Sequence, residues 1–331
     1  MALAGIAFIV GAIVSLATSW VLVTRLERVG ERFGFSEALL GIVAALAADA
    51  PEITSSISAL SQHQRTIGAG VVIGSNVFNL AALLGVAVLV SGFVALSRKV
   101  VILGGFVAMW VALCCILTVT AVLSIIEGLF LAAFVLVSYV VVLGLRRQVL
   151  AQLPVPQRWL KWLSSAVDEE ELELAAAIRP PRGRPIDALA ATVSLIIVVF
   201  SSIVMERSGS EVGHHFHLAD VVIGGIVLAA VTSLPNAVAA VHLASKGRGT
   251  AALSTALNSN NLNVVIGLLI PGAILGLAAP SSAGTLTAAS YVALTGLVLT
   301  VAFVKRGLSW RSGLLVITGY GIFVVWLLAI S

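Results

Sequence analysis

The chain has 331 residues, of which 60% are hydrophobic and only 10% are charged, and its mean hydropathy is +1.12. About a quarter of the residues in a soluble domain are charged, so this composition excludes an ordinary soluble protein and indicates a membrane protein. The basic residues behind the net charge of +4 are scattered over short segments, so we expect no nucleic-acid partner.

The apolar residues form continuous runs of about twenty residues, which predicts membrane-spanning helices rather than the alternating strands of a transmembrane barrel. The first run has no basic segment before it and is longer than a signal-peptide core, so we expect it to be a retained span. Cys114 and Cys115 are neighbours in the fourth run, where we expect two buried thiols. We predict ten spans, at residues 2–24, 36–62, 67–93, 98–119, 121–145, 187–205, 217–244, 250–277, 283–304 and 312–330.

The basic residues test this count, because Lys and Arg concentrate in cytoplasmic segments. With the N-terminus outside, all of the 19 basic residues except Arg65 and Arg207 fall in inner segments. Adding or removing one span would destroy this asymmetry. The sequence therefore predicts a multi-pass protein of the cell membrane with both termini outside.

One long polar segment, residues 146–186, divides the chain into halves of five spans each, 1–145 and 187–331. We predict a cytoplasmic linker, in which "LPVPQRWLKWL" is amphipathic and interfacial and the acidic run after it is a solvated helix. A second polar segment, 209–220, contains three histidines, His214, His215 and His217. They could bind a metal, but we favour a solvated loop because nothing nearby fixes their geometry.

The two halves contain an internal repeat at an offset of 184 residues. "GIVAALAADAPEITSSISALSQHQRT" (41–66) aligns with "GIVLAAVTSLPNAVAAVHLASKGRGT" (225–250), and "GSNVFN" (74–79) aligns with "NSNNLN" (258–263). Because five spans separate the copies, the second is inverted relative to the first, as in many secondary transporters whose substrate sites lie at the repeat interface. Pro51 and Pro235 interrupt the first helix of each copy and should free backbone carbonyls there.

Asp49 and Glu52 lie beside the first of these prolines, three residues apart on one helix face. A carboxylate in the middle of a membrane is costly and normally faces a functional pathway. Carboxylates, free carbonyls and the side chains of Ser, Thr and Asn are ligands of hard cations. Neither break contains a histidine or cysteine, which argues against zinc or copper.

At these residues the chain resembles the cation/calcium exchanger superfamily and, within it, the sodium/calcium exchangers. That family carries "G-T-S-x-P-E" and "G-S-N-x-x-[ND]" in each of two α-repeats. Here the first repeat reads "AADAPE" and "GSNVFN", and the second reads "VTSLPN" and "NSNNLN". The last residues of the two motifs are 27 positions apart in both copies, from Glu52 to Asn79 and from Asn236 to Asn263.

The resemblance implies an all-α polytopic membrane protein with ten transmembrane helices arranged as two inverted five-helix repeats. It also implies a calcium site that includes Glu52, the symmetry mate of Glu52, which is Asn236, and Thr232. Asp49 adds to this site a carboxylate that the usual motif lacks. Further cation ligands are expected at Ser75, Asn79, Ser233, Ser259 and Asn263.

Departures from the family pattern change the charge of the expected site. Asn236 stands where the family usually has a second glutamate, Asn263 where many members have aspartate, and Ala48 where the motif has threonine. The site then carries at most two negative charges, enough for one Ca²⁺ or two monovalent cations. Three sodium ions would leave uncompensated charge in a low dielectric, so we expect an altered stoichiometry that involves protons or two monovalent ions.

We therefore predict a secondary active antiporter that exchanges calcium for sodium or protons by alternating access. The expected partners are inorganic cations and the lipid bilayer, with no cofactor other than the transported ions, no obligate protein partner and no enzymatic activity. Alternatives are an exchanger of another cation for protons, a transport-inactive relative, and a channel, which normally needs symmetric subunits. An intramembrane protease is disfavoured because both acids lie on one helix and no "GxSG" motif occurs.

Overall fold

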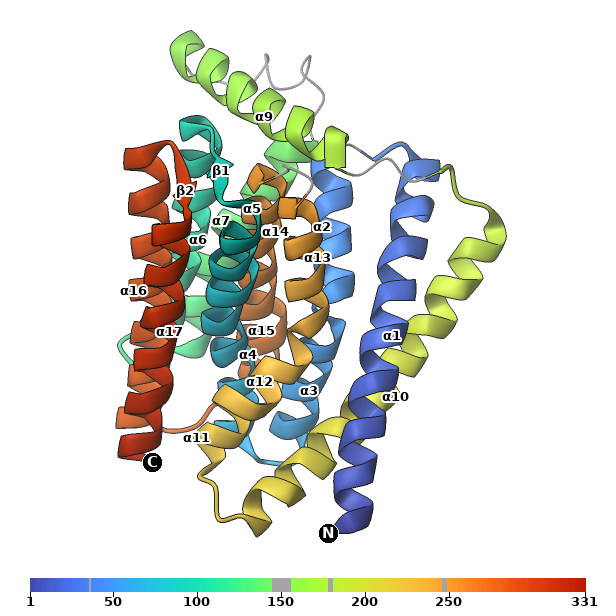
Figure 1. Ribbon diagram of the computed structural model, residues 1–331, viewed down its shortest axis with the longest axis vertical. Helices are drawn as coiled ribbons and strands as arrows, with labels where there is room; N and C mark the ends of the chain where they lie inside the picture. Colours follow the sequence, from blue (N-terminus) through green and yellow to red (C-terminus); the bar gives the residue numbers. More distant parts are fainter. Residues whose placement is uncertain (36, 145–155, 178–180, 246–248) are drawn as a thin grey trace.

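The computed structural model describes the whole chain except residues 36, 145–155, 178–180 and 246–248 (Figure 1). The described part consists almost wholly of helices, three of which contain a π-helical stretch, labelled η. The elements in chain order are α1 (Ala2–Phe33), α2 (Glu37–Ala48), α3 (Ala50–Ser61), α4 (Arg65–Asn79), η1 (Leu80–Val86), α5 (Ala87–Ser91), β1 (Phe93–Ala95), α6 (Arg98–Val119), α7 (Ile125–Gly144), α9 (Gln157–Ala177), α10 (Pro185–His215), α11 (Asp220–Val222), η2 (Ile223–Leu228), α12 (Ala229–Thr232), α13 (Leu234–Ser245), α14 (Gly249–Leu262), η3 (Asn263–Leu269), α15 (Ile270–Leu275), α16 (Ser282–Lys305), β2 (Gly307–Ser309) and α17 (Trp310–Ile330).

Up to ten membrane spans can be traced through the described residues. Eight helices are each long and apolar enough to cross a membrane. Two further spans are bent pairs: α2 with α3, at 49°, and the helix 220–232 with α13, at 44°. The predicted all-helical polytopic fold is confirmed, and most predicted spans end within a few residues of the observed helices.

Two of the predicted spans are shorter than the helices observed. α1 continues to residue 33 instead of 24, and α10 covers Pro185–His215 instead of 187–205. Each is therefore about 45 Å long or more, against a hydrocarbon thickness of about 30 Å, and Figure 1 shows both helices inclined. Residues 209–215, expected in a solvated loop, form the last turns of α10, because polar residues outside the hydrocarbon do not by themselves end a helix.

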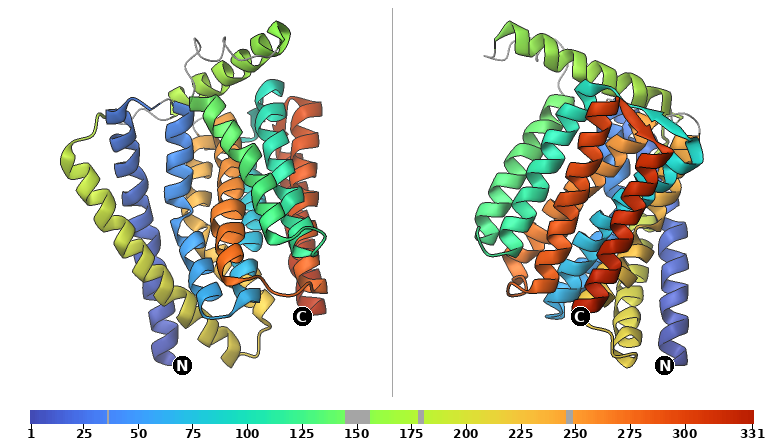
Figure 2. Two further views of the ribbon diagram at one scale, coloured as in Figure 1. Left: turned by 180° about the vertical axis from the view of Figure 1, so that it is seen from behind. Right: turned by 60° about the vertical axis from the view of Figure 1, so that its left-hand side comes forward.

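The helices form three layers (Figures 1 and 2). α1 and α10 pack together on one side, and α6, α7, α16 and α17 lie on the other. The middle layer holds the broken helices of both repeats. In Figure 1 the first repeat descends through α2 and α3 and returns upward through α4 and α5, whereas the second ascends through α11, α12 and α13 and returns downward through α14 and α15. The two helix pairs are therefore inverted relative to each other.

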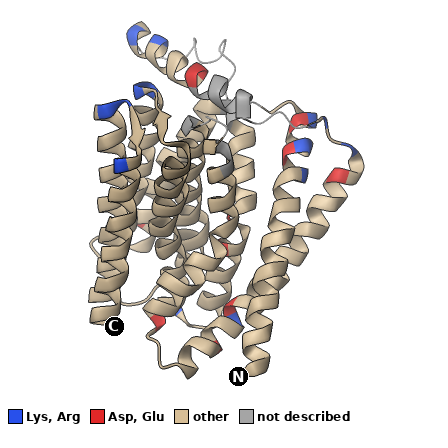
Figure 3. Ribbon diagram, in the orientation of Figure 1, with Lys and Arg blue, Asp and Glu red and all other residues tan. Residues whose placement is uncertain are grey.

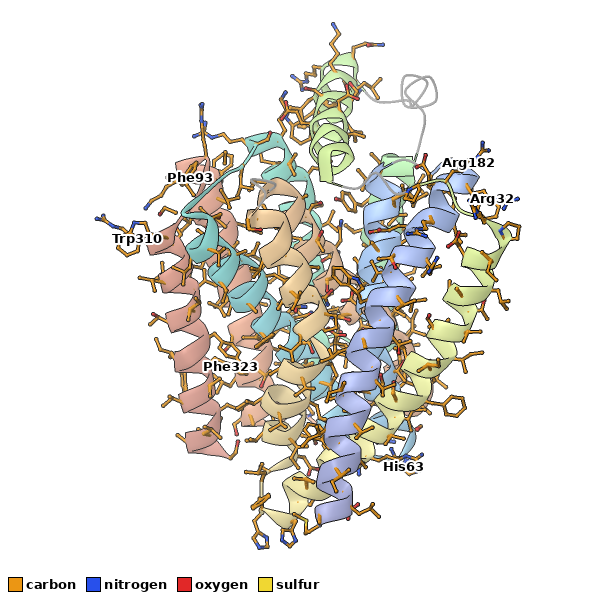
Figure 4. The ribbon with its side chains drawn as sticks, turned by 45° about the vertical axis from the view of Figure 1, so that its right-hand side comes forward. Arg32, His63, Phe93, Arg182, Trp310 and Phe323 are labelled. Carbon is orange, nitrogen blue, oxygen red and sulfur yellow. The ribbon has the colours of Figure 1, made fainter. Side chains whose placement is uncertain are left out.

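The ends of the bundle differ in charge. α9 lies across one end, here called the α9 face, and both chain termini lie at the opposite end, here called the terminal face (Figure 1). Figure 3 shows most of the described Lys and Arg residues at the α9 face. In Figure 4, Arg32 and Arg182 lie at this face and His63 lies at the terminal face. The basic residues at positions 146, 147, 179, 246 and 248 lie outside the described residues.

Polar contacts attach α9 to the start of α6. The Lys99 ammonium donates to Glu169 and to Ser165, at 2.6 Å in both cases, and Ser97 donates to the same Glu169 carboxylate. The hydrogen bond from Lys99 is the main cause that lowers the pKa of Glu169 below its ordinary value. Nearby, β1 and β2 form a short antiparallel ladder, a detail that the apolar pattern did not predict.

Burial is reversed relative to a soluble protein. Leu3 and Ile274 are about four-fifths exposed, at 80% and 78%, whereas Asp49, Glu52 and Glu206 have no exposed surface. Large apolar side chains cover the outside of α1, α7, α10 and α17. This arrangement suits a lipid solvent, in which the outer surface is apolar and buried polar groups mark the interior of the bundle.

The middle layer is held closely together where α4 crosses η2. A Cβ atom on Gly74 would lie 2.2 Å from the carbonyl oxygen of Gly225, and one on Gly70 would lie 2.9 Å from the Gly225 nitrogen. Only glycines permit this approach of two backbones. A Cβ atom on Gly225 points elsewhere, with Leu327 as its nearest neighbour at 3.7 Å.

This crossing generates a stability prediction with an internal control. We expect Gly74→Ala to lower the free energy of unfolding by about 1–3 kcal/mol, because α4 must move away from η2. Gly225→Ala should change it by no more than about 0.5 kcal/mol. Thermal unfolding of the detergent-purified protein, followed by tryptophan fluorescence, measures both. Equal stability of the two variants would contradict the close crossing.

Candidate cation site

Each helix of the middle layer departs from regular α-helix near its middle. α2 and α3 break at Asp49, and α12 and α13 break at Ser233. In both cases a proline follows two residues later, at the second position of the new helix, where its missing N–H costs least. α4 and α14 instead widen into η1 and η3 beside Asn79 and Asn263, and π-helical turns of this kind are frequent at functional sites.

These four irregularities converge on one buried polar region. The structure brings the nine sequence-predicted residues to it, and none of them has exposed surface. They are Asp49, Glu52, Ser75, Asn79, Thr232, Ser233, Asn236, Ser259 and Asn263.

The two carboxylates of the first repeat are joined by an amide of the second. Asn236 Nδ2 donates to Asp49 Oδ1 at 2.7 Å and to Glu52 Oε1 at 3.1 Å. Ser259 Oγ also donates to Asp49 Oδ1, at 2.5 Å. Asn236 is the symmetry mate of Glu52, so the pseudo-twofold relation places an amide opposite a carboxylate. The amide nitrogen here occupies the position, between two anionic oxygens, that a cation would favour.

Four asparagines reproduce the repeat symmetry in their hydrogen bonds. Asn76 Nδ2 donates to the Asn260 carbonyl at 3.1 Å, and Asn260 Nδ2 donates to the Asn76 carbonyl at 3.1 Å. Asn79 donates to Asn260 Oδ1 at 3.1 Å, and its mate Asn263 donates to Asn76 Oδ1 at 3.3 Å. These reciprocal bonds connect α4 to α14 and fix the two repeats against each other.

The second break adds hydroxyl and carbonyl oxygens. The hydroxyls of Ser75 and Thr232 lie 3.4 Å apart, and Ser75 also donates to the Ala229 carbonyl at 3.4 Å. At the first break, Pro51 cannot bond to the Ala47 carbonyl, as the sequence predicts. Ser19 of α1 donates to that carbonyl instead, at 3.3 Å.

Several polar side-chain atoms of the site have no hydrogen-bond partner among the described residues, and those of the predicted site residues are oxygens. Within the described part of the chain, several buried side-chain oxygens of this region accept or donate no hydrogen bond; they are Asp49 Oδ2, Glu52 Oε2, Asn79 Oδ1, Ser233 Oγ, Asn236 Oδ1 and Asn263 Oδ1. A set of carboxylate, amide and hydroxyl oxygens without nitrogen or sulfur is the ligand chemistry of hard cations such as Ca²⁺ and Na⁺.

The charge of the site comes from the two acids alone. None of the ion pairs between described residues involves Asp49 or Glu52. Two buried carboxylates without a basic partner are stable only when protonated, hydrogen-bonded or neutralised by a bound cation. A bound cation or protons at these oxygen atoms would each neutralise the charge of the site.

Sequence reasoning did not assign a role to every residue of this region. Asn76 and Asn260 are identical residues at matching positions of the two repeats. This identity could have pointed to them, but the motifs do not predict them as site residues. The histidine segment forms no metal site in the described residues, where no group of three or more His, Cys, Asp or Glu could hold an ion. His214 instead lies 2.9 Å from Asp220, on a half-exposed surface.

The geometry can now be compared with known proteins. The family model described as sodium/calcium exchanger protein matches residues 3–146 and 187–329, most of the chain. The chain belongs to the sodium/calcium exchanger family. The family expected from the repeat motifs is thereby confirmed.

Individual relatives of this family member extend over almost its whole length. Inner membrane protein YrbG of Escherichia coli (strain K12) is 25% identical over 339 residues, covering 99% of this chain and 96% of the relative. The H+/Ca2+ exchanger CAX has a similar fold, with a TM-score of 0.71 at 12% identity, covering 99% of this chain and 86% of the other. The sodium-calcium exchanger NCX_Mj gives a TM-score of 0.59 at 20% identity, covering 99% and 100%.

The asparagine contacts generate a paired prediction. Asn76→Ala and Asn260→Ala each remove one donor to a backbone carbonyl and one amide acceptor. We expect each to lower the free energy of unfolding by about 1–2 kcal/mol, within about 0.5 kcal/mol of each other. Chemical or thermal unfolding in detergent measures both. A loss confined to one variant would show that the reciprocal bonds do not contribute equally.

Proposed function

We propose that the protein is a secondary active antiporter, and not an enzyme, that carries Ca²⁺ in exchange for Na⁺ or H⁺. Its buried group of oxygen ligands around Asp49 and Glu52 is the observation that carries this proposal. Family membership supports it, since similar proteins are named sodium/potassium/calcium exchanger, sodium-calcium exchanger and H+/Ca2+ exchanger.

The charge of the site limits the stoichiometry. One Ca²⁺ neutralises both carboxylates, and so do two monovalent ions or two protons. Three Na⁺ would leave an excess positive charge in a region without solvent, which is costly. We therefore propose exchange of one Ca²⁺ against two monovalent cations or protons, with Asn236 turning its amide oxygen toward the bound ion; both ends of an amide occupy similar space.

The arrangement of the helices in layers supports alternating access. All nine proposed ligands are enclosed in this conformation, so a cation can enter or leave only after a helix moves. α1 and α10 are the candidates, because they form a separate layer beside the site (Figure 2). The proposed motion slides this pair over the middle layer, which stays fixed by the glycine crossing and the asparagine bonds.

The protein is a multi-pass membrane protein, and we propose that it lies in the cell membrane with its α9 face cytoplasmic. The concentration of Lys and Arg at that face supports this orientation (Figure 3). Both termini and the loop after α3 then lie outside. Residues 146–186 would form a cytoplasmic linker between two five-helix halves, 1–145 and 187–331.

Charge removal tests the ligand assignment. We expect Glu52→Gln and Asp49→Asn each to reduce radioactive calcium uptake at least about tenfold, because each halves the charge available to the ion. The measurement uses everted membrane vesicles with an imposed sodium or proton gradient. Glu31→Gln, at an exposed position of α1, is the matched control and should transport normally. Full uptake by both site variants would refute the assignment, and wild-type uptake that ignores both gradients would refute exchange.

Charge addition tests the role of Asn236. Asn236→Asp replaces the amide that donates to the two site carboxylates by a third carboxylate, which has nearly the same size. Without divalent cation we expect the free energy of unfolding to fall by about 3–5 kcal/mol, and added Ca²⁺ should raise the melting temperature more than in the wild type. Thermal unfolding with and without Ca²⁺ measures this. An equal calcium response in both proteins would place Asn236 outside the ion site.

A further inference from the structure

A third acid, Glu206 of α10, is as fully buried as the two site carboxylates. Ser58 Oγ donates to its Oε2 at 2.6 Å, and Gln62 Nε2 donates to the same atom at 3.0 Å. Ser210 Oγ donates to Oε1 at 3.2 Å. Ser58 belongs to α3, the helix that carries Glu52, and Gln62 directly follows the end of that helix.

No basic side chain of the described residues forms an ion pair with Glu206. Its charged neighbour along the helix is Arg207, and α1 has no charged residue before Arg25. The only charged residue of α3 is Glu52. Burial of a carboxylate among neutral donors alone is costly, so packing between helices, for which serine would suffice, does not explain an acid at this position.

Glu206 continues a line of buried polar groups that begins at the central site. On α3, Glu52, Ser55 and Ser58 follow one another at spacings of three residues, which places them on one helix face, and Gln62 follows directly after the end of the helix. Ser55 Oγ lies 3.5 Å from the Ser202 carbonyl of α10. We call these contacts between α3 and α10 the polar seam.

The polar seam extends from α1 as well. Ser15 of α1 and Ser202 of α10 share a hydrogen bond of 2.8 Å, and Ser19 bonds to the Ala47 carbonyl at the first break. At its other end the seam reaches Gln62, directly before His63, which Figure 4 shows at the terminal face. The seam therefore runs from the central carboxylates to the terminal face, along the boundary between the α1–α10 layer and the middle layer.

We propose that Glu206 is a third cation-binding carboxylate, located outside the central site on the passage between that site and the terminal face. In the present conformation Ser58 and Gln62 both donate to its Oε2 and hold α10 against α3, while Ser210 of α10 itself donates to Oε1. When α10 moves away from α3, these bonds break, and the freed carboxylate takes up the hard cation that the protein carries before it reaches Asp49 and Glu52. This inference rests on the proposed function.

The test compares calcium uptake from the two faces, in right-side-out and everted vesicles whose orientation is verified by protease access to an N-terminal tag. Glu206→Gln keeps the size and hydrogen-bonding capacity of the side chain but removes its charge. We expect it to raise the Ca²⁺ concentration for half-maximal uptake at least threefold at the terminal face and to leave the value at the α9 face unchanged. Glu211→Gln, at an exposed position of the same helix, is the matched control and should alter neither face.

A second variant separates ion binding from packing. Ser58→Ala removes one competitor for the Glu206 oxygens and keeps the charge, so it should lower the half-maximal concentration at the terminal face, opposite to Glu206→Gln. A purely structural contact would shift both variants in the same direction, and equal effects at both faces, or none, would overturn the proposal. If Glu206→Gln does not fold, the direction of the Ser58→Ala shift decides. Absence of gradient-driven uptake in the wild type would instead refute the proposed function itself.

Discussion

The structure depends on one constraint: two carboxylates are kept away from water in the interior of an apolar bundle. Asp49 and Glu52 belong to one repeat, and the groups that stabilise them, the Asn236 amide and the Ser259 hydroxyl, belong to the other. Neither repeat alone can bury its polar residues at low cost, so the charge of the first repeat requires the amide and hydroxyl donors of the second. The same contacts make the arrangement sensitive to a cation, because an ion that binds both acids competes directly with the amide nitrogen.

The backbone of the two repeats follows the repeat symmetry, whereas the acidic residues do not, and the two features have different consequences. The reciprocal bonds between Asn76 and Asn260 and the two proline breaks follow the repeat closely, and they determine where the ligands lie. The acids do not follow it, because the mates of Asp49 and Glu52 are Ser233 and Asn236. An inward and an outward conformation of such a protein are therefore related in shape but not in electrostatics, since moving helices approach a charged break on one side and a neutral break on the other.

Much of this organisation could be predicted from the sequence, for physical reasons. Apolar runs of bilayer length predict spans, Pro51 and Pro235 predict breaks, and identity at a fixed offset predicts which helices meet. Other features leave no such signal. The added turns of α1 and α10 lie in polar sequence that is compatible with both helix and loop, and the π-helical stretches have ordinary α-helical composition. Glu206 lies outside the repeat motifs and directly after the predicted end of a span at residue 205, so only its contacts with Ser58 and Gln62 identify it.

The boundaries between layers explain which parts can move. α4 and η2 touch through glycine backbones, which leave no room for a side chain between the two helices. The boundary between α10 and α3 is instead made of serines, whose short side chains exchange hydrogen-bond partners at little cost. Within the described residues, the polar seam is thus the boundary on which the proposed shift of α1 and α10 would take place, while the glycine crossing would keep the proposed ligands in place. Because the seam begins at the first break and contains a buried acid, the boundary that we propose to move is also the route that we propose for the cation.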